Sequence, residues 1–378
     1  MFEGLFAWKA SLPCPGPYES LHRESKSTLA SLSMFDGAKL DATAVLSPNF
    51  HASHALQWGS AASPPVYHFG IGYQLANSML SGQLDSQYNL QARAHHVWHA
   101  ESPVQENAQV PATDLLTSAA PAQPAMSILP RPSIKTKIDT SLPAVDGAQP
   151  MIAIEHEHVG KDWSLSLKAM NPNPLDTPSA KAGSKCGASV TGIYSLAYLQ
   201  SVSRSIVLGG ELMYQRPTPD ISEPSYTLVA KWTPEPTALD PPTTLPAGMV
   251  SPFPAPPPQD PTQTLTVSTS PSSGMTQCTY WKRLNQRLEV SGELQALTTP
   301  GSSATGQPGR REAIASVGFR LQTVFSMVRG MIDTAGRVCG ISEYTLAPGL
   351  VFSIAGEIDY GKVGSEAGKV GVGLGLEM

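Results

Sequence analysis

The chain has 378 residues, of which 15% are charged and 41% hydrophobic, and its formal net charge is −5. Soluble proteins usually carry roughly a quarter of charged residues, so this composition disfavours a charged soluble enzyme, and the small net charge disfavours nucleic-acid binding. No segment reaches the ~20 apolar residues that a membrane helix needs. A β-barrel fits the same numbers, because its strands show lipid a hydrophobic side chain only at every second position.

The N-terminal residues 1–20 lack a basic region, a long apolar core and a small-residue cleavage site, so they do not indicate a secretory signal peptide. A bacterial outer-membrane barrel would need such a signal, and a barrel here therefore indicates a eukaryotic organelle. Helical periodicity is almost absent after residue 33, so a helix is expected only before that residue.

After residue 33 the sequence consists of segments of roughly ten residues in which apolar and polar side chains alternate. The pattern is clearest in 206–215, 288–296, 350–360 and 369–377. A period of two places the apolar set on one face of a β-strand. Segments of about ten residues also suit tilted strands that cross a bilayer. Aromatic side chains near segment ends match an interfacial girdle: Trp98, Trp163, Trp232 and Tyr360.

Counting these segments predicts 19 strands between residues 34 and 377. An odd number of strands closes a barrel only if the first and last strands pair in parallel, as in mitochondrial porins. We therefore predict an all-β transmembrane barrel of 19 strands with parallel closure. The alternative fold is a soluble β-sandwich with one buried face and one wet face.

Proline-rich tracts interrupt the alternation at about 99–132, 171–187 and 234–263. Proline lacks the N–H donor of a sheet ladder, so these tracts are expected to be loops inserted between strands. The predicted organisation is an N-terminal leader, residues 1–33, followed by a barrel, residues 34–378.

The cysteines and histidines do not predict a metal site or a cofactor. Cys14, Cys186, Cys278 and Cys339 are far apart and form no CxxC pair. The runs 95–99 and 155–158 contain several histidines, yet neither offers three or four ligands on one side of a strand. With no recognisable nucleophile or phosphate-loop motif either, we expect no metal, no cofactor and no enzymatic activity.

Several short segments, in the same order along the chain, resemble a known family. They are 15–19 (PGPYE), 35–40 (FDGAKL), 46–50 (LSPNF), 65–70 (PVYHFG), 168–172 (KAMNP), 195–202 (SLAYLQSV) and 328–336 (VRGMIDTAG). Together they resemble the channel-forming subunit of the mitochondrial outer-membrane protein translocase, the TOM complex, within the mitochondrial porin superfamily.

The resemblance implies a 19-stranded barrel in the mitochondrial outer membrane with the helix of residues 18–32 inside the lumen. The alternative for this helix is a position on the membrane surface. Family members conduct unfolded precursor proteins, and their partners are presequence receptors, small single-helix subunits and outer-membrane lipids. Two or three pores associate in such complexes. No nucleic-acid partner is expected.

Carboxylates on the polar faces of the strands are candidate binding sites for basic mitochondrial presequences. Spread around a lumen, they would hold a basic segment weakly at several places, so that it can both enter and leave. A plain alternative is that a wet lumen needs charges and pairs some of them. The candidate residues are Glu155, Glu157, Glu211, Glu289, Glu293, Glu357 and Asp359.

The last strand fits the sorting signal that mitochondrial barrels present to their insertion machinery, a polar residue, a glycine and two apolar residues. These are Lys369, Gly371, Leu374 and Leu376. Arg329 lies on the strand that resembles the family's dimer-facing edge, where a cation could contact lipid phosphate or an acidic partner. It could equally be a lumen residue, because it shares a face with Met327, Met331 and Asp333.

The predicted function is a protein-conducting channel that imports precursor proteins across the mitochondrial outer membrane. A metabolite porin of the voltage-dependent anion channel type is the nearest alternative, because it shares the fold. A soluble β-sandwich interaction protein is the alternative from another class.

Overall fold

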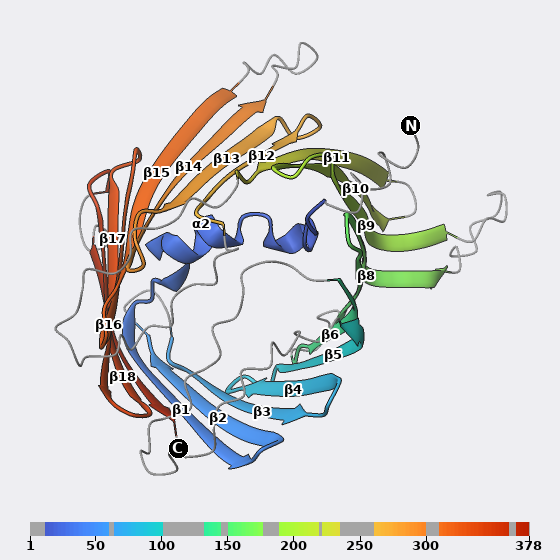
Figure 1. Cartoon of the computed structure of the whole chain (residues 1–378). Coiled ribbons are helices and arrows are strands. Elements are labelled where there is room, and N and C mark those ends of the chain that lie inside the picture. The colour runs from blue at the N-terminus through green and yellow to red at the C-terminus, as the bar shows by residue number, and fades with distance from the viewer. Residues whose placement is uncertain are drawn as a thin grey trace, which may run out of the picture.

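The chain forms a single closed β-barrel that holds an N-terminal segment in its lumen, as Figure 1 shows for the computed structural model. The structure describes residues 12–59, 64–100, 132–144, 150–176, 189–218, 221–234, 261–299, 310–362 and 368–377. Much of the three predicted proline-rich loops lies outside these residues. The division into a leader of residues 1–33 and a barrel of residues 34–378 therefore stays a prediction.

The described residues contain 19 strands in one sheet. In chain order they are β1 (Gly37–Ser47), β2 (Phe50–Trp58), β3 (Val66–Gln74), β4 (Ser78–Asp85), β5 (Leu90–Ala100), β6 (Ser133–Leu142), β7 (Met151–Val159), β8 (Trp163–Asp176), β9 (Ser189–Ser201), β10 (Ile206–Thr218), β11 (Ile221–Trp232), β12 (Gln263–Ser270), β13 (Met275–Arg283), β14 (Leu288–Thr299), β15 (Arg310–Gln322), β16 (Ser326–Asp333), β17 (Arg337–Ala347), β18 (Leu350–Asp359) and β19 (Gly368–Glu377).

The barrel closes between its first and last strands. β1 and β19 pair in parallel, with Gly37 opposite Gly371 and Ala42 opposite Leu376, whereas the other neighbouring strands are antiparallel. The predicted strand number and parallel closure are confirmed. Because every strand belongs to one closed sheet, the alternative of a two-sheet sandwich is excluded.

The alternation in the sequence separates an outer apolar face from an inner polar face. Leu208 and Leu212 of β10 are exposed on the outside, whereas Glu211 between them faces the leader. Trp98 and Tyr360 lie at strand ends and are 65% and 74% exposed, which suits an interfacial girdle. The structure therefore has the two faces expected of a barrel in lipid.

β8 is longer than its sequence indicates. Residues 171–176, assigned to the proline-rich loop of residues 171–187, continue the strand through two irregularities in its pairing with β9. Asn171 adopts a positive φ of 46°, a conformation that asparagine tolerates better than most residues. A bulge of this kind lets a strand continue past an unpaired residue. Residues 177–187 of the predicted loop lie outside the described residues.

The leader contains three short helical pieces within the barrel instead of one helix over residues 18–32. They are η1 (Tyr18–Ser20), α2 (Arg23–Thr28) and η2 (Ala30–Ser33). α2 ends because Leu29 is extended, with φ −73° and ψ 136°. The hydroxyls of Ser27 and Thr28 also donate back to the carbonyl oxygen of Glu24, a bond that favours helix ends. The lumen position is confirmed, and the surface position is wrong.

No helix among the described residues is both long enough and apolar enough to cross a membrane.

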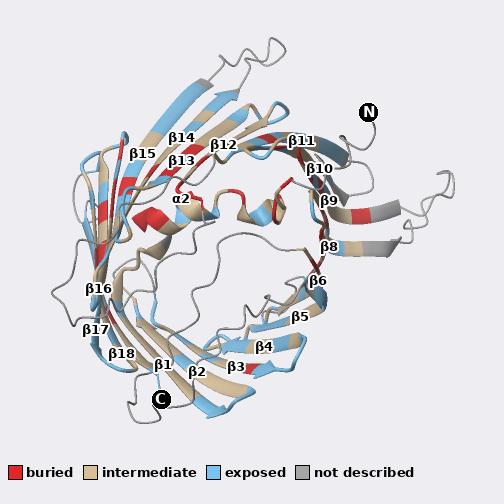
Figure 2. Cartoon of the chain, viewed as in Figure 1, coloured by how far each residue is buried: buried red, intermediate tan, exposed pale blue. Residues whose placement is uncertain are grey.

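The best-buried residues gather where the leader meets the wall (Figure 2). Leu21 packs against Leu199, Val207 and Val229 of β9, β10 and β11. At the other end, Leu29 and Ala30 contribute to a cluster with residues of β16, β17 and β18: Met331, Cys339, Ile341 and Ala355. Full burial of one leucine contributes about 1.5–3 kcal/mol. Two apolar anchors thus hold the leader along one side of the lumen.

Candidate conducting lumen

Ion pairs between the leader and the wall begin at Glu19. Its carboxylate lies 3.3 Å from Nζ of Lys137 on β6 and 3.1 Å from Nζ of Lys168 on β8. Lys137 also contacts Glu155 of β7 at 3.2 Å. Partial burial acts to raise the pKa of Glu19, but the two lysine ammonium groups outweigh it and hold this pKa below its usual range. Glu19 therefore stays ionised between two strands of the wall.

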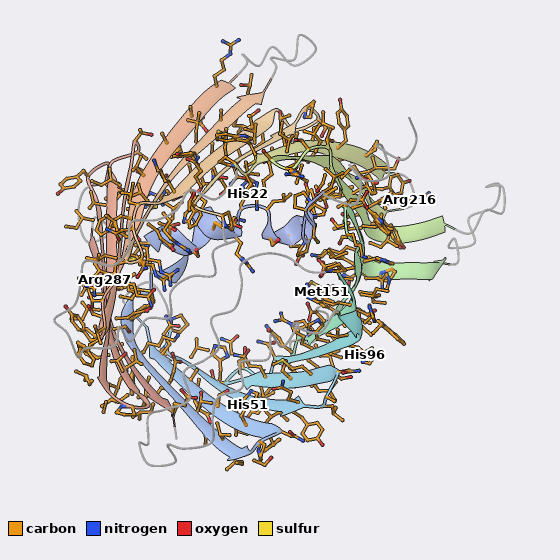
Figure 3. The ribbon with its side chains drawn as sticks, in the orientation of Figure 1. His22, His51, His96, Met151, Arg216 and Arg287 are labelled. Atoms are coloured by element: carbon orange, nitrogen blue, oxygen red, sulfur yellow. The ribbon has the colours of Figure 1, made fainter. Side chains whose placement is uncertain are left out.

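α2 and the residue before it add polar contacts with another part of the wall, strands β11, β13 and β14. Glu24 lies 3.3 Å from Nζ of Lys231 on β11, and the hydroxyls of Ser25 and Ser291 are 2.6 Å apart. The Nδ1 atom of His22 lies 3.0 Å from the hydroxyl of Thr279. Figure 3 shows His22 between the leader and the wall. Burial, reinforced by nearby lysines, lowers the pKa of His22, so its neutral form is favoured while the leader is docked.

Two of the predicted presequence carboxylates lie buried on β7. Glu155 and Glu157 are 7% and 4% exposed. One oxygen of Glu155 contacts Lys137, while the other, also buried, has no hydrogen-bond partner among the described residues. Both carboxylates face inward as predicted. Their burial nevertheless keeps a passing polypeptide from direct contact while the leader is in place.

Glu211 of β10 lies close to the first turn of the leader. It accepts a hydrogen bond from the hydroxyl of Ser195 on β9 and shares a hollow with Tyr18 and His22. Burial and the negative charge of Glu211 raise the pKa of Tyr18 well above its ordinary value. Tyr18 therefore stays a neutral phenol beside this carboxylate.

The two predicted carboxylates of β14 have different surroundings. Glu289 is compensated by Arg283 at 3.2 Å and Arg320 at 3.8 Å. Glu293 instead accepts hydrogen bonds from the amides of Gln277 and Gln295 at 2.7 and 2.6 Å. An amide is neutral, so Glu293 keeps a net negative charge that Glu289 largely loses.

β18 places Glu357 and Asp359 on the lumen side, on the same strand face as the buried Ala355. Glu357 lies opposite Lys369 of β19 in the sheet register, and it is half-buried. Asp359 accepts a hydrogen bond from the N–H of Gly361 at 2.9 Å and lies 3.7 Å from Lys362, so it also shapes the turn after β18.

The seven predicted carboxylates therefore face the lumen from four separate regions, β7, β10, β14 and β18. The structure does not bring them together into one site. Glu293 combines a net charge with partial exposure, and Glu357 and Asp359 are partly exposed beside Lys369 and Lys362. Glu155 and Glu157 are buried, and Glu289 is compensated by two arginines.

Arg329 points into the lumen. One of its guanidinium nitrogens donates to the hydroxyl of Ser33 at 2.6 Å, and another lies 3.7 Å from Glu343 of β17. Arg329 thus lies on the lumen face and anchors the end of the leader. The contact with lipid phosphate or an acidic partner stays a prediction. The sequence did not predict that Ser33 and Glu343 contact Arg329, because neither residue belongs to a recognisable pattern.

The predicted sorting residues lie on a strand that is paired along both edges. Leu374 and Leu376 face Leu40 and Ala42 of β1 in register, and Lys369 and Gly371 point inward. A Cβ atom on Gly371 would lie 2.7 Å from the Phe35 ring and would also clash with the Phe35 carbonyl oxygen. This glycine thus has a packing role at the barrel seam, independent of any signal.

Two features of the lumen remain outside these sets. Arg23 and Lys26 of α2 are exposed to the open lumen, so the leader presents positive charge on its free side. No group of three or more metal-ligating side chains occurs within the part of the chain that the structure describes.

Comparison with known proteins agrees with this architecture. The profile of the family described as eukaryotic porin matches residues 14–115 and 127–371. The mitochondrial import receptor subunit tom40 of Neurospora crassa is 24% identical over 96% of this chain and 83% of its own length. The TOM40 subunit of Saccharomyces cerevisiae is 24% identical over 96% of this chain and 78% of its own length.

A plant relative gives the same result: the probable mitochondrial import receptor subunit TOM40-2 of Arabidopsis thaliana is 22% identical over 93% of this chain and 88% of its own length. The match thus extends over nearly the whole barrel and concerns a pore-forming protein, not an enzyme. The chain belongs to the eukaryotic porin family and, within it, to the Tom40 group of mitochondrial outer-membrane barrels.

Proposed function

We propose that this chain is a protein-conducting channel that takes precursor proteins with basic presequences across the mitochondrial outer membrane. Its relatives in fungi and plants are named mitochondrial import receptor subunits. The leader lies against one side of the barrel and leaves the other side of the lumen uncovered by helix (Figure 1). An extended polypeptide needs such a passage.

The observation that carries the proposal is the placement of carboxylates from separate strands on one lumen. Presequences are basic and amphipathic. Glu293, Glu357 and Asp359 are each partly exposed, so a basic segment can exchange between them and can replace Lys362 at Asp359. Several weak contacts allow transport, whereas one tight site would hold the substrate.

Glu155, Glu157 and Glu211 are proposed as a second set that acts when the leader shifts. All three lie beneath or beside its first turn, and Glu155 already holds Lys137. Displacing Glu19 would break its ion pairs with Lys137 and Lys168 and would uncover these carboxylates. Glu289 is expected to contribute least, because two arginines compensate it.

We propose further that the chain assembles with presequence receptors and small single-helix subunits of a TOM complex, in which two or three pores associate. The names of the relatives, which describe them as subunits, support this. We also propose that Lys369, Gly371, Leu374 and Leu376 form the sorting signal. Before β19 is paired, its free edges can add to another sheet, which is what recognition by strand addition requires.

Single-channel recording of the purified full-length chain in a planar bilayer tests the function. A basic presequence peptide should block the channel for measurable dwell times. The triple variant Glu293→Gln, Glu357→Gln and Asp359→Asn should shorten them about tenfold, whereas Glu289→Gln, at the carboxylate that two arginines compensate, should change them least. Full-length block in the triple variant would contradict the electrostatic part of the proposal.

The metabolite-porin alternative predicts a different result in the same recordings. A pore of that type would prefer anions and would show no block by the presequence peptide at any applied voltage. Clear anion preference without peptide block would therefore replace protein conduction with metabolite conduction.

A further inference from the structure

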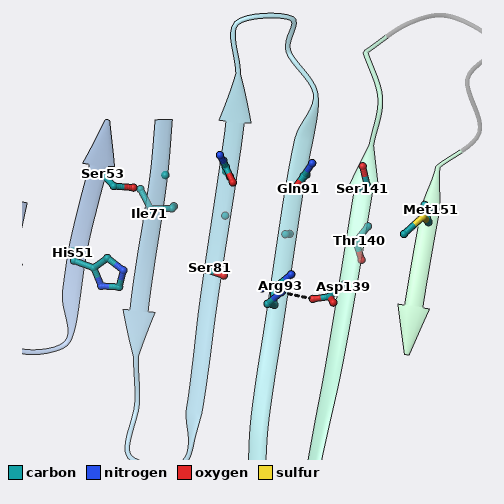
Figure 4. A pocket seen from close by; sticks show the side chains of 14 residues that line it. His51, Ser53, Ile71, Ser81, Gln91, Arg93, Asp139, Thr140, Ser141 and Met151 are labelled. Carbon is teal, nitrogen blue, oxygen red and sulfur yellow. Dashed lines mark hydrogen bonds and ion pairs between the residues drawn. The ribbon is translucent and has the colours of Figure 1, made fainter. Parts of the chain in front are cut away.

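The wall across the lumen from the leader contains a hollow with chemistry unlike that of the carboxylate sites. It has a volume of about 470 Å³ and is lined by residues of β2 to β7. Figure 4 shows it, and in Figure 3 His51 and Met151 lie on the lumen side of this wall. Thr140 lines it from the other face of β6, between Asp139 and Ser141. The polar side chains of the lumen face that line it without an ionic partner are His51, Ser53, Ser81, Gln83, Gln91 and Ser141.

This hollow carries hydrogen-bonding groups but almost no net charge. Its one cation, Arg93, lies 2.6 Å from Asp139, so the two charges compensate each other. None of the six polar side chains makes a side-chain hydrogen bond or an ion pair with another described residue. Gln83 and Gln91 are exposed, and the other four are partly exposed. Their donors and acceptors are therefore open to a molecule in the lumen.

The leader side of the wall differs, because its polar groups already satisfy one another. Lys137 is held between Glu19 and Glu155, and Glu289 lies between two arginines. A translocating chain would thus find fixed charges on one side of the lumen and unpaired neutral groups on the other.

Two glycines of β3 set the position of the side chains at one edge of the hollow. A Cβ atom on Gly72 would clash with the ring of His51, and one on Gly70 would lie 2.5 Å from the hydroxyl oxygen of Ser53. His51 and Ser53 therefore lean over β3 because that strand presents bare backbone there. The geometry of the hollow depends on these two positions.

We propose that this hollow binds extended, uncharged segments of the translocating polypeptide through their backbone amides and small polar side chains. The inference rests on the proposed function. It gives a binding place to the uncharged segments of the substrate, which the carboxylates cannot hold. An extended backbone presents both donors and acceptors, which glutamine, serine and neutral histidine can match. Side chains two apart on a strand repeat every ~6.6 Å, as do equivalent backbone groups of an extended peptide.

Binding of this kind is independent of sequence and weak, because each exposed hydrogen bond replaces one to water. Weak contacts suit a passage that must release its substrate. A hollow of neutral groups would hold the extended chain that follows a presequence, after the basic segment has passed the carboxylates.

The test uses the purified full-length channel in a planar bilayer with two probes: an unstructured peptide of Gly, Ser, Asn and Gln, and the basic presequence peptide. In the variant Gln83→Leu/Gln91→Leu, dwell times of the uncharged peptide should fall about threefold to tenfold. Block by the basic peptide should change less than about twofold. Gln57→Leu, a lumen-facing glutamine of β2 outside the hollow, is the matched control and should leave both unchanged.

Gly72→Ala offers a second variant that keeps every polar group but displaces His51, and it should also shorten the dwell of the uncharged peptide. Dwell times unchanged in both variants, or reduced equally by Gln57→Leu, would overturn the proposal. The two proposals fail separately: a wild-type channel that neither peptide blocks contradicts protein conduction itself. If the basic peptide blocks the channel but the leucine substitutions leave the dwell time of the uncharged peptide unchanged, only the proposal for the hollow is contradicted.

Discussion

The hydroxyl of Ser25 in the leader lies 2.6 Å from the hydroxyl of Ser291 on β14, a contact between residues 266 positions apart. Both side chains are almost fully buried, at 2% and 0% exposure. The contact lies midway between the two apolar anchors, Leu21 and Leu29. Together they make the leader a fixed part of the lumen wall, and this geometry leads to the predictions that follow.

Replacing the buried anchor Leu29 by alanine should loosen the leader. Leu29 is 2% exposed in the cluster with Met331 and Ile341, and a leucine-to-alanine change in such a site costs about 2–5 kcal/mol. Since 1.4 kcal/mol corresponds to a factor of ten, trypsin cleavage after Arg23 and Lys26 should accelerate at least about tenfold. Ser31→Ala, an exposed position of the same segment, is the control, and equal cleavage of both variants would argue against the anchor.

Acidification should release the leader in two steps. Burial lowers the pKa of His22 below 6.5, so docking is strongest above that pH and weakens as pH falls below 6.5, where the released histidine takes up a proton more readily. Glu19, whose pKa lies below its unperturbed 4.5, stabilises docking above pH 4.5 and loses this effect as pH falls through its docked value.

A spin label at Lys26→Cys would report this release as greater mobility at pH 5.5 than at pH 7.5. His22→Gln should abolish the change in that range, because glutamine has no proton to gain there. A pH response that persists in His22→Gln would assign the first step to another group.

Removing the Glu19 carboxylate should make the lumen more selective for anions. Glu19→Gln leaves Lys137 and Lys168 with less compensation, and the reversal potential in a KCl gradient should shift accordingly. Arg23→Gln removes an exposed lumen cation and should shift it in the opposite direction. Identical shifts, or none, would show that the leader does not border the conducting path.

Gly371→Ala should impair barrel assembly, and a second substitution separates the two causes. Phe35→Ala removes the ring part of the clash but not the clash with the carbonyl oxygen. If packing is responsible, it should restore part of the assembly of the alanine variant, seen as recovery of the membrane-integrated form after carbonate extraction. If recognition of the sorting signal is responsible, Phe35→Ala should not restore it. We expect partial recovery, because both roles fall on the same glycine.

The sequence determines much of this fold because the relevant pattern is local. Alternation with a period of two marks each strand and its two faces, as in Leu208, Glu211 and Leu212, and the odd strand count requires parallel closure of β1 with β19. The end of α2 at Leu29 was harder to see, because residues 18–32 contain no proline or glycine.

The pairing within the lumen could not be predicted from sequence. Glu19 meets Lys137 and Lys168 across 118 and 149 positions, a relation that only closure of the barrel creates. The same limit applies to Arg329. It shares a strand face with Met327, Met331 and Asp333, and this mixture of apolar and acidic residues does not indicate whether the face borders lipid or lumen. Burial of Glu155 and Glu157 likewise depends on where the leader docks.

Import of a labelled, presequence-bearing precursor into mitochondria depleted of this chain tests the central claim most directly. Import should fall with depletion and recover with the wild-type chain, whereas the Glu293→Gln, Glu357→Gln and Asp359→Asn variant, assembled to the same level, should restore it only partly. Undiminished import after depletion would contradict protein conduction by this barrel.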